Sequence, residues 1–423
     1  LAFLPGIDAL YDGSGQGGPS LQFARPTQNV TPINNVGYDG TGVALSVTEG
    51  ERGFAANPLL TWAGFYDGAQ PFADHPTAVG GMIRSSDATQ HGLAGDVSLF
   101  SANGSYSVFA TMAAAMDWGS TNARVLSNSW YWDSVNTAAP WAADRQQDWF
   151  VRQNFDSVLV ASGNFGNGCG SGFSTFVVSP AKGNNILAIG NDTDVDTVAW
   201  AGDAMNTCSS FGDPQNSVGG TIAKPEMSGV GTTITSTLAN VSPPLTGPVG
   251  SGTSYSTPMV AATAADIMEA DSGLTVNPEA VKALLMATAL HNIEGASRYS
   301  DVDGAGSLVG AAAAVSAERG NWTIQSIGST TVFPITQTQF AYAGEKVRFV
   351  VAWSSNPNAA YTTDPLPADI DLVAYRADGT TVLGASASVH NAFEIVEFRT
   401  SLHHPALARF ADPGTRAAQG VPT

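Results

Sequence analysis

Short apolar runs alternate with helical stretches between residues 42 and 317, and this alternation limits the possible folds more than any other feature of the sequence. Buried strands are predicted at residues 43–47, 97–100, 125–126, 157–161 and 185–189. Helical periodicity is found at residues 108–118, 141–154, 256–269 and 278–289. Such alternation is typical of the α/β class, in which helices cover both faces of a parallel sheet.

The pattern changes after Arg319. Strand-like runs at residues 347–353, 370–375, 380–383 and 392–398 are separated by Asn, Asp, Gly and Pro, with no helical stretch among them. We therefore expect three regions: an N-terminal extension (1–39) that packs on the α/β domain, the α/β domain itself (40–318), and a smaller all-β sandwich domain (319–423). From residue 403 onward the sequence gives no sign of a final strand, so we expect the chain end to be loose or truncated.

Charge and hydropathy exclude several classes of partner. The chain carries 36 Asp and Glu against 17 Lys and Arg, a formal net charge of −19. Such a surface repels phosphate backbones and anionic lipids, which argues against nucleic-acid and membrane-surface partners. No apolar run is long enough to predict a membrane span. No basic-then-apolar signal sequence follows Leu1, which fits a processed, mature chain.

The most informative short motif is Gly-Thr-Ser-Tyr-Ser-Thr-Pro at residues 252–258, just before an Ala-rich helical segment. Ser254 in this motif precedes a helix start, where free N–H groups and the positive end of the helix dipole face developing negative charge. Gly252 permits a close approach, and Pro258 suits the first turn of a helix. The motif fits a nucleophile, and it fits a plain Ser/Thr helix cap equally well.

Two other motifs supply partners for such a serine. His75 opens a segment of small residues that is predicted to be helical, and the chain has only 6 histidines that could act as a base. Asn164 follows the strand predicted at residues 157–161. Because open α/β sheets bind ligands at the carboxyl ends of their strands, Asn164 is expected at the functional edge, where its amide could donate to an oxyanion.

In the order His75, Asn164, Ser254, these motifs resemble those of the subtilases, the subtilisin-like serine proteases. The resemblance covers most of residues 40–317. It includes Gly-Thr-Gly-Val-Ala-Leu-Ser-Val (40–47), Gly-Leu-Ala-Gly-Asp-Val-Ser-Leu (92–99), Ser-Ser-Phe-Gly (209–212), Lys-Pro-Glu (224–226) and Asp-Gly-Ala-Gly-Ser-Leu-Val (303–309).

The resemblance implies a secreted serine endopeptidase that acts on proteins or peptides. Ser254 would attack the peptide carbonyl, and His75 would take its proton and later give it to the leaving amine. Asn164 and the Ser254 backbone N–H would form the oxyanion hole. The residues implied in substrate binding are Asn103, Gly104, Ser105, Ser129, Trp130, Ser162 and Gly163.

The catalytic acid departs from the family pattern. The family usually has Asp-Ser/Thr-Gly at the end of its first strand, whereas this chain has Glu49-Gly50 there. Glu49 therefore falls on the position of the acid, and a Glu can orient the histidine if its extra methylene is accommodated. Asp39, Asp67 and Asp74 remain rivals, although Asp74 adjoins His75 in sequence and is badly placed to orient its ring.

Two further positions differ from the family. Pro76 and Ala78 replace the Gly and second His that usually follow the catalytic histidine. The segment Ser-Trp-Tyr at residues 129–131 stands where a Ser-Leu-Gly-like wall usually lines the specificity pocket. A large side chain there would either narrow the pocket or pack outside it.

Three other functions are compatible with these departures. One is a catalytically inactive, subtilase-like binding protein. Another is an acid-acting, sedolisin-like peptidase, although sedolisins use a Glu base and an Asp in the oxyanion hole, where this chain has His75 and Asn164. The third places the main function in the C-terminal domain as a binding module. We expect that domain, which resembles the jelly-roll-like domains of other subtilases, to stabilise the catalytic domain instead.

The resemblance also suggests bound groups. Subtilases commonly hold structural Ca²⁺, and Asp192, Asp194 and Asp196 are candidate ligands that could equally be solvated acids of a loop. No organic cofactor is expected, and the protein is expected to be a monomer. Cys169 and Cys208 could be a disulfide or two buried thiols. The family places the segments around them on adjacent parts of one sheet edge, which favours the disulfide.

Overall fold

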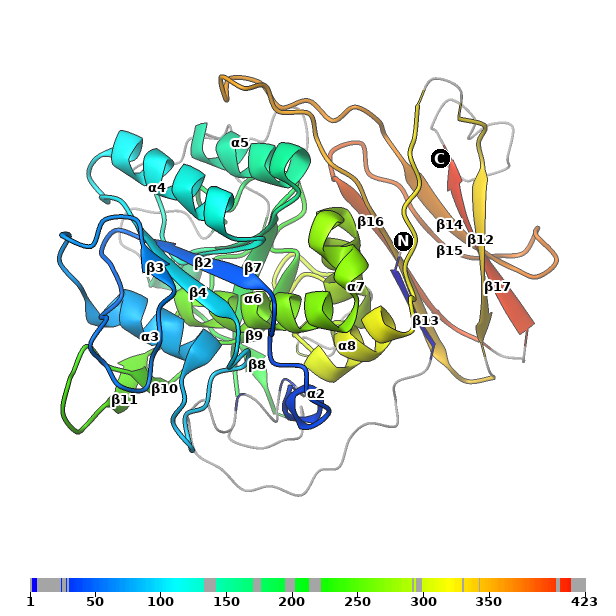
Figure 1. Cartoon of the computed structure of the whole chain (residues 1–423). Helices are drawn as coiled ribbons and strands as arrows, with labels where there is room; N and C mark the ends of the chain where they lie inside the picture. The colour runs from blue at the N-terminus through cyan, green and yellow to red at the C-terminus, as the bar shows by residue number, and fades with distance from the viewer. Residues whose placement is uncertain are drawn as a thin grey trace.

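In the computed structural model, one eight-stranded sheet runs in the order β3-β4-β2-β5-β6-β7-β8, with β9 beside β7 (Figure 1). All of its strand pairs are parallel except β7 with β8. The strands are β2 Ala44–Glu49, β3 Gly64–Phe65, β4 Ser98–Asn103, β5 Val125–Asn128, β6 Ser157–Ala161, β7 Leu187–Thr193, β8 Ala204–Met205 and β9 Met227–Val230. The structure describes residues 2–5, 24, 28, 30–132, 142–169, 176–194, 202–212, 222–290, 293, 299–328, 331–341, 343–400 and 404–411.

Helices cover both faces of this sheet, so the predicted α/β class is confirmed (Figure 1). On one face lie α4 (Phe109–Asn122) and α5 (Ala142–Trp149), which continues into a π-helical turn (Phe150–Asn154). On the other lie α3 (Asp74–Arg84), α6 (Thr253–Ala270), α7 (Pro278–Thr288) and α8 (Gly310–Glu318). The remaining elements of this part are the short helices α2 (Thr31–Asn35), Gly166–Gly168 and Ser272–Val276, and the hairpin β10 (Ile234–Thr237) and β11 (Thr246–Gly250). No helix in the described part of the chain is long and apolar enough to cross a membrane.

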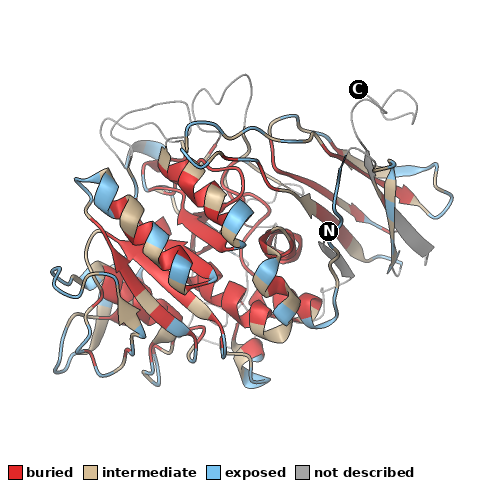
Figure 2. Ribbon diagram, turned by 45° about the horizontal axis from the view of Figure 1, so that its top comes forward, coloured by how far each residue is buried: buried red, intermediate tan, exposed pale blue. Residues whose placement is uncertain are grey.

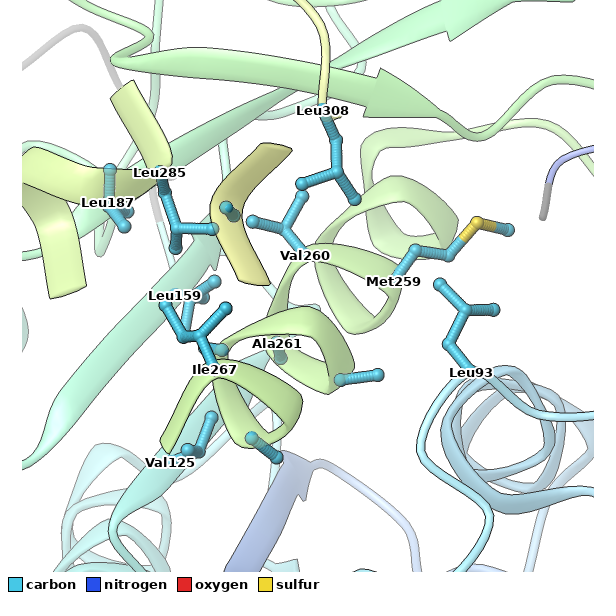
Figure 3. Packing of buried hydrophobic residues seen from close by; sticks show 14 of the residues in the cluster. Leu93, Val125, Leu159, Leu187, Met259, Val260, Ala261, Ile267, Leu285 and Leu308 are labelled. Carbon is cyan, nitrogen blue, oxygen red and sulfur yellow. The ribbon is translucent and has the colours of Figure 1, made fainter. Parts of the chain in front are cut away.

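Helix α6 runs through the main core, which explains its Ala-rich sequence. Nearly all of its side chains are buried, so it has no solvated face (Figure 2). Figure 3 shows Met259, Val260 and Ile267 of α6 meeting leucine and valine side chains from the sheet and from neighbouring segments. A helix that is buried all round needs small residues where its neighbours approach closely. This packing fixes the start of α6, and with it Ser254.

Strands β2, β4 and β5 extend further at their carboxyl ends than the apolar pattern predicts. The extra residues include Glu49, Asn103 and Asn128, which are polar and nevertheless almost fully buried. An apolar-run criterion stops where polar residues begin, so it cannot detect strand ends that carry buried polar groups. These ends form the edge at which the candidate site lies.

The C-terminal region consists of two antiparallel sheets, which confirms the predicted β-class of this domain. One sheet has the order β1-β13-β16 and the other β12-β17-β14-β15. Their strands are β1 Ala2–Pro5, β12 Ile335–Ala341, β13 Lys346–Ala352, β14 Asp371–Arg376, β15 Val382–Ser386, β16 Phe393–Arg399 and β17 His404–Ala411. The first strand of the chain therefore pairs with the C-terminal domain, whereas α2 contacts α8 of the α/β domain.

The expectation that the chain lacks a final strand after residue 403 is wrong. Strand β17 pairs with β12 along one side and with β14 along the other. Its sequence is rich in Ala and contains Pro405, so its intrinsic strand propensity is low. Pairing on both sides supplies the stability that local sequence does not.

Candidate active site

Four residues predicted to act together lie at or beside the carboxyl ends of the parallel strands. Glu49 ends β2, Asn164 follows β6, His75 is in the first turn of α3, and Ser254 is in the first turn of α6. The sheet brings these segments to one edge because its central strands are parallel and all end there. Residues far apart in the sequence thereby become neighbours, as His75 and Tyr255 do with ring centroids 5.6 Å apart.

Glu49 and His75 are in contact. Oε2 of Glu49 lies 3.4 Å from Nδ1 of His75, and the Glu49 side chain is completely buried, whereas that of His75 is 35% exposed. Burial lowers the pKa of His75 because it opposes the charged imidazolium. The negative charge of Glu49, its hydrogen bond and, to a smaller extent, the charge of Glu51 together leave this pKa above its ordinary value. The extra methylene of Glu is therefore compatible with contact to the imidazole.

The Glu49 carboxylate has a second partner that sequence reasoning missed. The Tyr106 hydroxyl donates to the same oxygen, Oε2, at 2.9 Å. The other oxygen, Oε1, is buried and accepts no hydrogen bond from any described residue. The only available signal was that Tyr106 directly follows Asn103, Gly104 and Ser105, which the family resemblance implies in substrate binding.

The rival aspartates are engaged elsewhere. Asp39 accepts a hydrogen bond from the Thr41 hydroxyl, and Asp67 accepts one from the backbone of Ala69. Asp74 accepts one from the backbone N–H of Ala239. Among the described residues, Glu49 is the only acidic residue that forms an ion-pair contact with His75.

Ser254 is held by a reciprocal pair of hydrogen bonds with Ser129, at the end of β5. Its hydroxyl donates to the Ser129 carbonyl (3.2 Å), and the Ser129 hydroxyl donates to the Ser254 carbonyl (2.9 Å). That carbonyl is available because Pro258, four residues on, has no N–H to donate within the helix. Ser129 thus compensates for the proline in the motif.

The backbone N–H of Ser254 has no acceptor among the described residues. Its neighbours are both occupied, because the N–H of Thr253 donates to Asn164 Oδ1 and that of Tyr255 donates to the Gly252 carbonyl. An unpaired N–H at a helix N-terminus is a donor ready for an anion. It therefore meets the chemical requirement for one half of an oxyanion hole.

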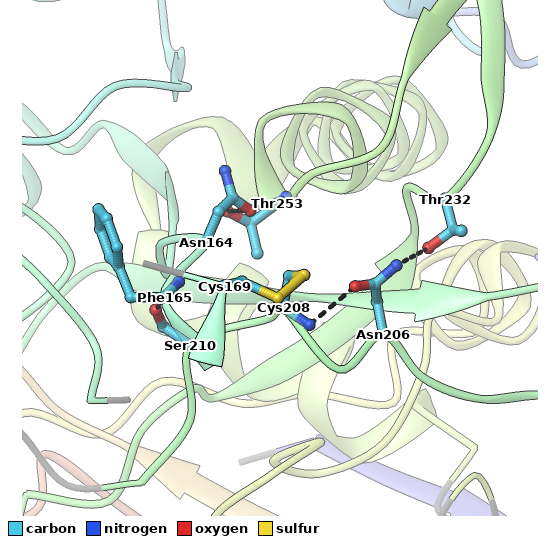
Figure 4. Close-up of a disulfide and its surroundings, with 8 residues drawn as sticks. All are labelled: Asn164, Phe165, Cys169, Asn206, Cys208, Ser210, Thr232 and Thr253. Atoms are coloured by element: carbon cyan, nitrogen blue, oxygen red, sulfur yellow. Dashed lines mark hydrogen bonds between the residues drawn. A yellow bond between two sulfur atoms is a disulfide. The ribbon is translucent and has the colours of Figure 1, made fainter. Parts of the chain in front are cut away.

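Asn164 supplies a second donor beside it. Its Oδ1 accepts hydrogen bonds from the Thr253 N–H (2.9 Å) and the Thr253 hydroxyl (3.2 Å), as drawn in Figure 4. These bonds orient the amide, and its Nδ2 makes no hydrogen bond within the described part of the chain. The exposed side chain can therefore offer its N–H₂ to a ligand.

The strand-to-loop turn before Asn164 requires a glycine. Gly163 has φ +115°, and a Cβ there would lie 2.8 Å from Val178 Cγ2 and 2.9 Å from Ser210 Oγ. Ser162 is buried, and its hydroxyl donates to the Ser210 carbonyl. Ser162 and Gly163, predicted to bind substrate, therefore shape the loop that carries Asn164.

The carboxyl end of β4 and the residues after it form another part of the site. Gly104 donates its N–H to the Glu49 carbonyl at 2.9 Å, and a Cβ on Gly104 would lie 2.5 Å from Met112 Cα. Asn103 is buried and exchanges hydrogen bonds with the backbone of Asp67, at 3.3 and 3.4 Å. Ser105 accepts a hydrogen bond from Ser107. These contacts fix the carboxyl end of β4 next to Glu49.

Trp130 packs away from solvent. It is 3% exposed and belongs to a core cluster with Met112, Met116 and Phe150. Tyr131 is half-exposed and packs edge-on against Phe165, with ring centroids 5.1 Å apart. A large side chain at this position was expected either to narrow the specificity pocket or to pack outside it. Trp130 packs in the core and therefore follows the second alternative.

The predicted disulfide is formed between Cys169 and Cys208 (Figure 4). It joins the loop after Asn164 to the segment before Ser210. The Gly166 N–H also donates to the Cys208 carbonyl at 3.0 Å. The link therefore braces the loop that carries the candidate oxyanion donor.

Metal ligands are not brought together in the described residues. No group of three or more His, Cys, Asp or Glu side chains there could hold a metal ion. Asp192 is buried in β7, Asp194 follows β7, and Asp196 lies outside the described residues. Ca²⁺ therefore remains a prediction from family resemblance.

Comparison with known proteins agrees with this geometry. A family model described as "Subtilase family" matches residues 63–321. The match includes His75, Asn164 and Ser254 and begins after Glu49. No curated protein matches the chain at a significant level.

Proposed function

The chain belongs to the subtilase family of serine peptidases, and from this membership we propose that it is an endopeptidase that works through an acyl-enzyme on Ser254. In this proposal His75 is the general base and acid, and Glu49 holds its ring. Asn164 Nδ2 and the Ser254 N–H bind the oxyanion. The substrates are proteins or peptides.

The proposed reaction begins with a rotation of the Ser254 hydroxyl from the Ser129 carbonyl towards His75. His75 takes the hydroxyl proton as Oγ attacks the peptide carbonyl, and the carbonyl oxygen becomes an anion between the two donors. The imidazolium then protonates the leaving amine, so the C–N bond breaks and the acyl-enzyme remains. Water, activated by His75 in the same way, releases the acid product.

The observation that carries the proposal is the 3.4 Å contact between the buried Glu49 carboxylate and His75 Nδ1. A carboxylate on Nδ1 selects the tautomer whose Nε2 is free to accept a proton, and it stabilises the imidazolium that forms. The contact provides this even though the family's Asp is absent.

A fluorophosphonate probe tests the nucleophile directly. We expect covalent labelling of the folded protein on Ser254, with no labelling of Ser254→Ala and much slower labelling of His75→Ala. The neighbouring Ser256, which is buried in the same helix, provides the matched control, since Ser256→Ala should label normally. Folded protein that does not label would support the inactive binding protein instead.

The acid-acting, sedolisin-like alternative differs in its pH dependence. A neutral histidine base requires activity that disappears on acidification, whereas a carboxylate base would work in acid. We favour the histidine base because Asn164, rather than an Asp, stands beside the Ser254 N–H. Peptidase activity that peaks in acid would contradict this choice.

We also propose that the protein works outside the cell, with the Cys169–Cys208 disulfide as support, because such links persist mainly in oxidising compartments. Structural Ca²⁺ is proposed on family resemblance alone. A thermal midpoint that a chelator leaves unchanged would remove the calcium proposal.

A further inference from the structure

Tyr106 connects the segment after β4 to the candidate triad acid. It follows β4 and is 44% exposed, so its ring lies at the surface of the site. Its hydroxyl donates to Glu49 Oε2, the same oxygen that faces His75. Within the described part of the chain, Tyr106 is the only side chain other than His75 that contacts this carboxylate.

Gly50 makes room for this contact. A Cβ on Gly50 would lie 2.2 Å from Tyr106 Cε2 and 2.3 Å from Cδ2, so the ring occupies the space that any side chain at residue 50 needs. The φ of Gly50 is not in the left-handed region, so the backbone itself would accept another residue. The ring, and not the chain conformation, therefore demands glycine here.

A glutamate needs an anchor more than an aspartate does in this position. It has one more rotatable bond, so its carboxylate can occupy more positions around the end of β2. Oε1 has no partner among the described residues, which leaves Oε2 to fix the orientation. A hydrogen bond to that oxygen restricts the carboxylate to the position that faces His75.

We propose that Tyr106 is a positioning residue for the triad, which holds Glu49 against His75, and that Gly50 is the small residue that admits it. The inference rests on the proposed function, since it assumes that Glu49 is the triad acid.

Carboxylates surround these groups. Glu49 and Glu51 act on both His75 and Tyr106, and Glu49 and Asp74 act on Tyr255, whose ring packs against His75. Partial burial, with these charges, raises the pKa of Tyr106 well above its usual value. The hydroxyl therefore keeps its proton and remains a donor throughout the working range of a histidine base.

Steady-state kinetics of Tyr106→Phe test the role. We expect kcat to fall about tenfold with KM nearly unchanged, since a hydrogen bond to a charged group is lost and substrate contacts remain. The acid limb of kcat/KM should move to lower pH, because a Glu49 carboxylate that is no longer held against His75 stabilises the imidazolium less. Tyr66→Phe is the matched control, since Tyr66 is also exposed and its hydroxyl has no hydrogen-bond partner among the described residues. It should leave both readouts unchanged.

Two further variants separate positioning from packing. Gly50→Ala should reproduce the fall in kcat, because its methyl group displaces the Tyr106 ring. In a Glu49→Gln background, Tyr106→Phe should cost nothing more, since the carboxylate that it positions is gone. An equal loss in both backgrounds, or a change in KM alone, would show that Tyr106 contacts substrate instead and would overturn the inference. So would an acid limb that stays in place or moves to higher pH.

The same set distinguishes failure of the inference from failure of the proposed function. If Glu49→Gln retains wild-type kcat, Glu49 is not the triad acid and the proposed mechanism is wrong. If Glu49→Gln loses activity by several orders of magnitude while Tyr106→Phe keeps it, only the positioning role is wrong.

Discussion

The seam between the two domains and the carboxyl edge of the large sheet both bury charged groups, but they use their hydrogen bonds differently. At the seam, Arg348 of β13 donates to the carbonyls of Met286, Ala289 and Ala305 at 2.7–3.0 Å. It also donates twice to Glu397. At the sheet edge, the Ser254 N–H and Glu49 Oε1 have no partner among the described residues.

The lysines beside the seam follow the pattern of Arg348. Lys282 Nζ donates to the carbonyls of Asn184 and Ile186 and to Glu226, and Lys224 Nζ donates to Glu226 and the Gly183 carbonyl. A buried charge with several hydrogen-bond partners fixes structure, because moving it would leave those groups unpaired. The sheet edge keeps donors unpaired, and only a ligand can use them. Stability and activity should therefore respond to different residues.

The largest expected effect is on activity. Ser254→Ala should lower kcat by on the order of 10⁶, as loss of a triad member does in this family. The thermal midpoint should stay the same or rise, because the lost hydroxyl makes only one 3.2 Å hydrogen bond at the surface of the site. Peptide hydrolysis and thermal unfolding of the same preparation measure both. A large loss of stability would contradict the division between the two regions.

Arg348→Met tests the seam, where we expect the change to lower stability and leave activity unchanged. We expect a loss of about 3–5 kcal/mol in the free energy of unfolding, because Glu397 Oε2 and three carbonyls, including two near the end of α7, lose their donor. Denaturant unfolding measures it, and kcat of the remaining folded protein should be unchanged. Arg152, an exposed residue in the π-helical turn, is the matched control, and Arg152→Met should change stability little. Equal losses of unfolding free energy in the two variants would mean that the contacts of Arg348 stabilise the fold no more than an exposed arginine does.

Sequence anticipated the donors at the sheet edge better than those at the seam. Ser254, His75 and Asn164 each stand in a short motif whose residue types report their chemistry. Arg348 stands in an ordinary strand pattern, and nothing local indicates that its side chain leaves the β-domain to reach α7. Long-range polar contacts depend on tertiary packing, which single-sequence patterns do not encode.

The candidate triad acid lies between these two cases in how far the sequence predicts it. Glu49 was assigned from its register at the end of the first strand, and the structure brings it to His75. Its anchor Tyr106 was not detected, since the reason for glycine at residue 50 is a ring 56 positions later in the chain. Pro258 shows the reverse: the sequence displays a helix residue without an N–H, but only the structure shows that Ser129 compensates for it.

Asn164 allows its two functions to be separated within one side chain. Asn164→Ala should lower kcat by on the order of 10²–10³, the cost of one oxyanion donor as measured in subtilisin. Asn164→Asp should keep the acceptor for the Thr253 N–H while removing the donor, so kcat should fall at least as far. Thermal unfolding should show that the Asp variant is the more stable of the two. If Asn164→Asp retained kcat, Nδ2 would not be an oxyanion donor.

The smallest expected effect is a shift in pH dependence, and it has opposite signs for activity and stability. Burial lowers the pKa of His75, but the charge of Glu49, its hydrogen bond and the charge of Glu51 together leave the folded pKa above the ordinary value of 6.5. Since only the neutral ring can act as a base, kcat/KM should fall as the pH drops, with a midpoint above 6.5. The favourable charge interaction stabilises the fold fully below pH 6.5 and is lost as the pH rises through the folded pKa. Activity should therefore increase over the pH range in which this contribution to stability disappears. Glu49→Gln removes the attraction and should move the midpoint of its residual activity to lower pH. An unmoved midpoint would show that Glu49 does not act on His75, and the sheet edge would then hold its histidine in some other way.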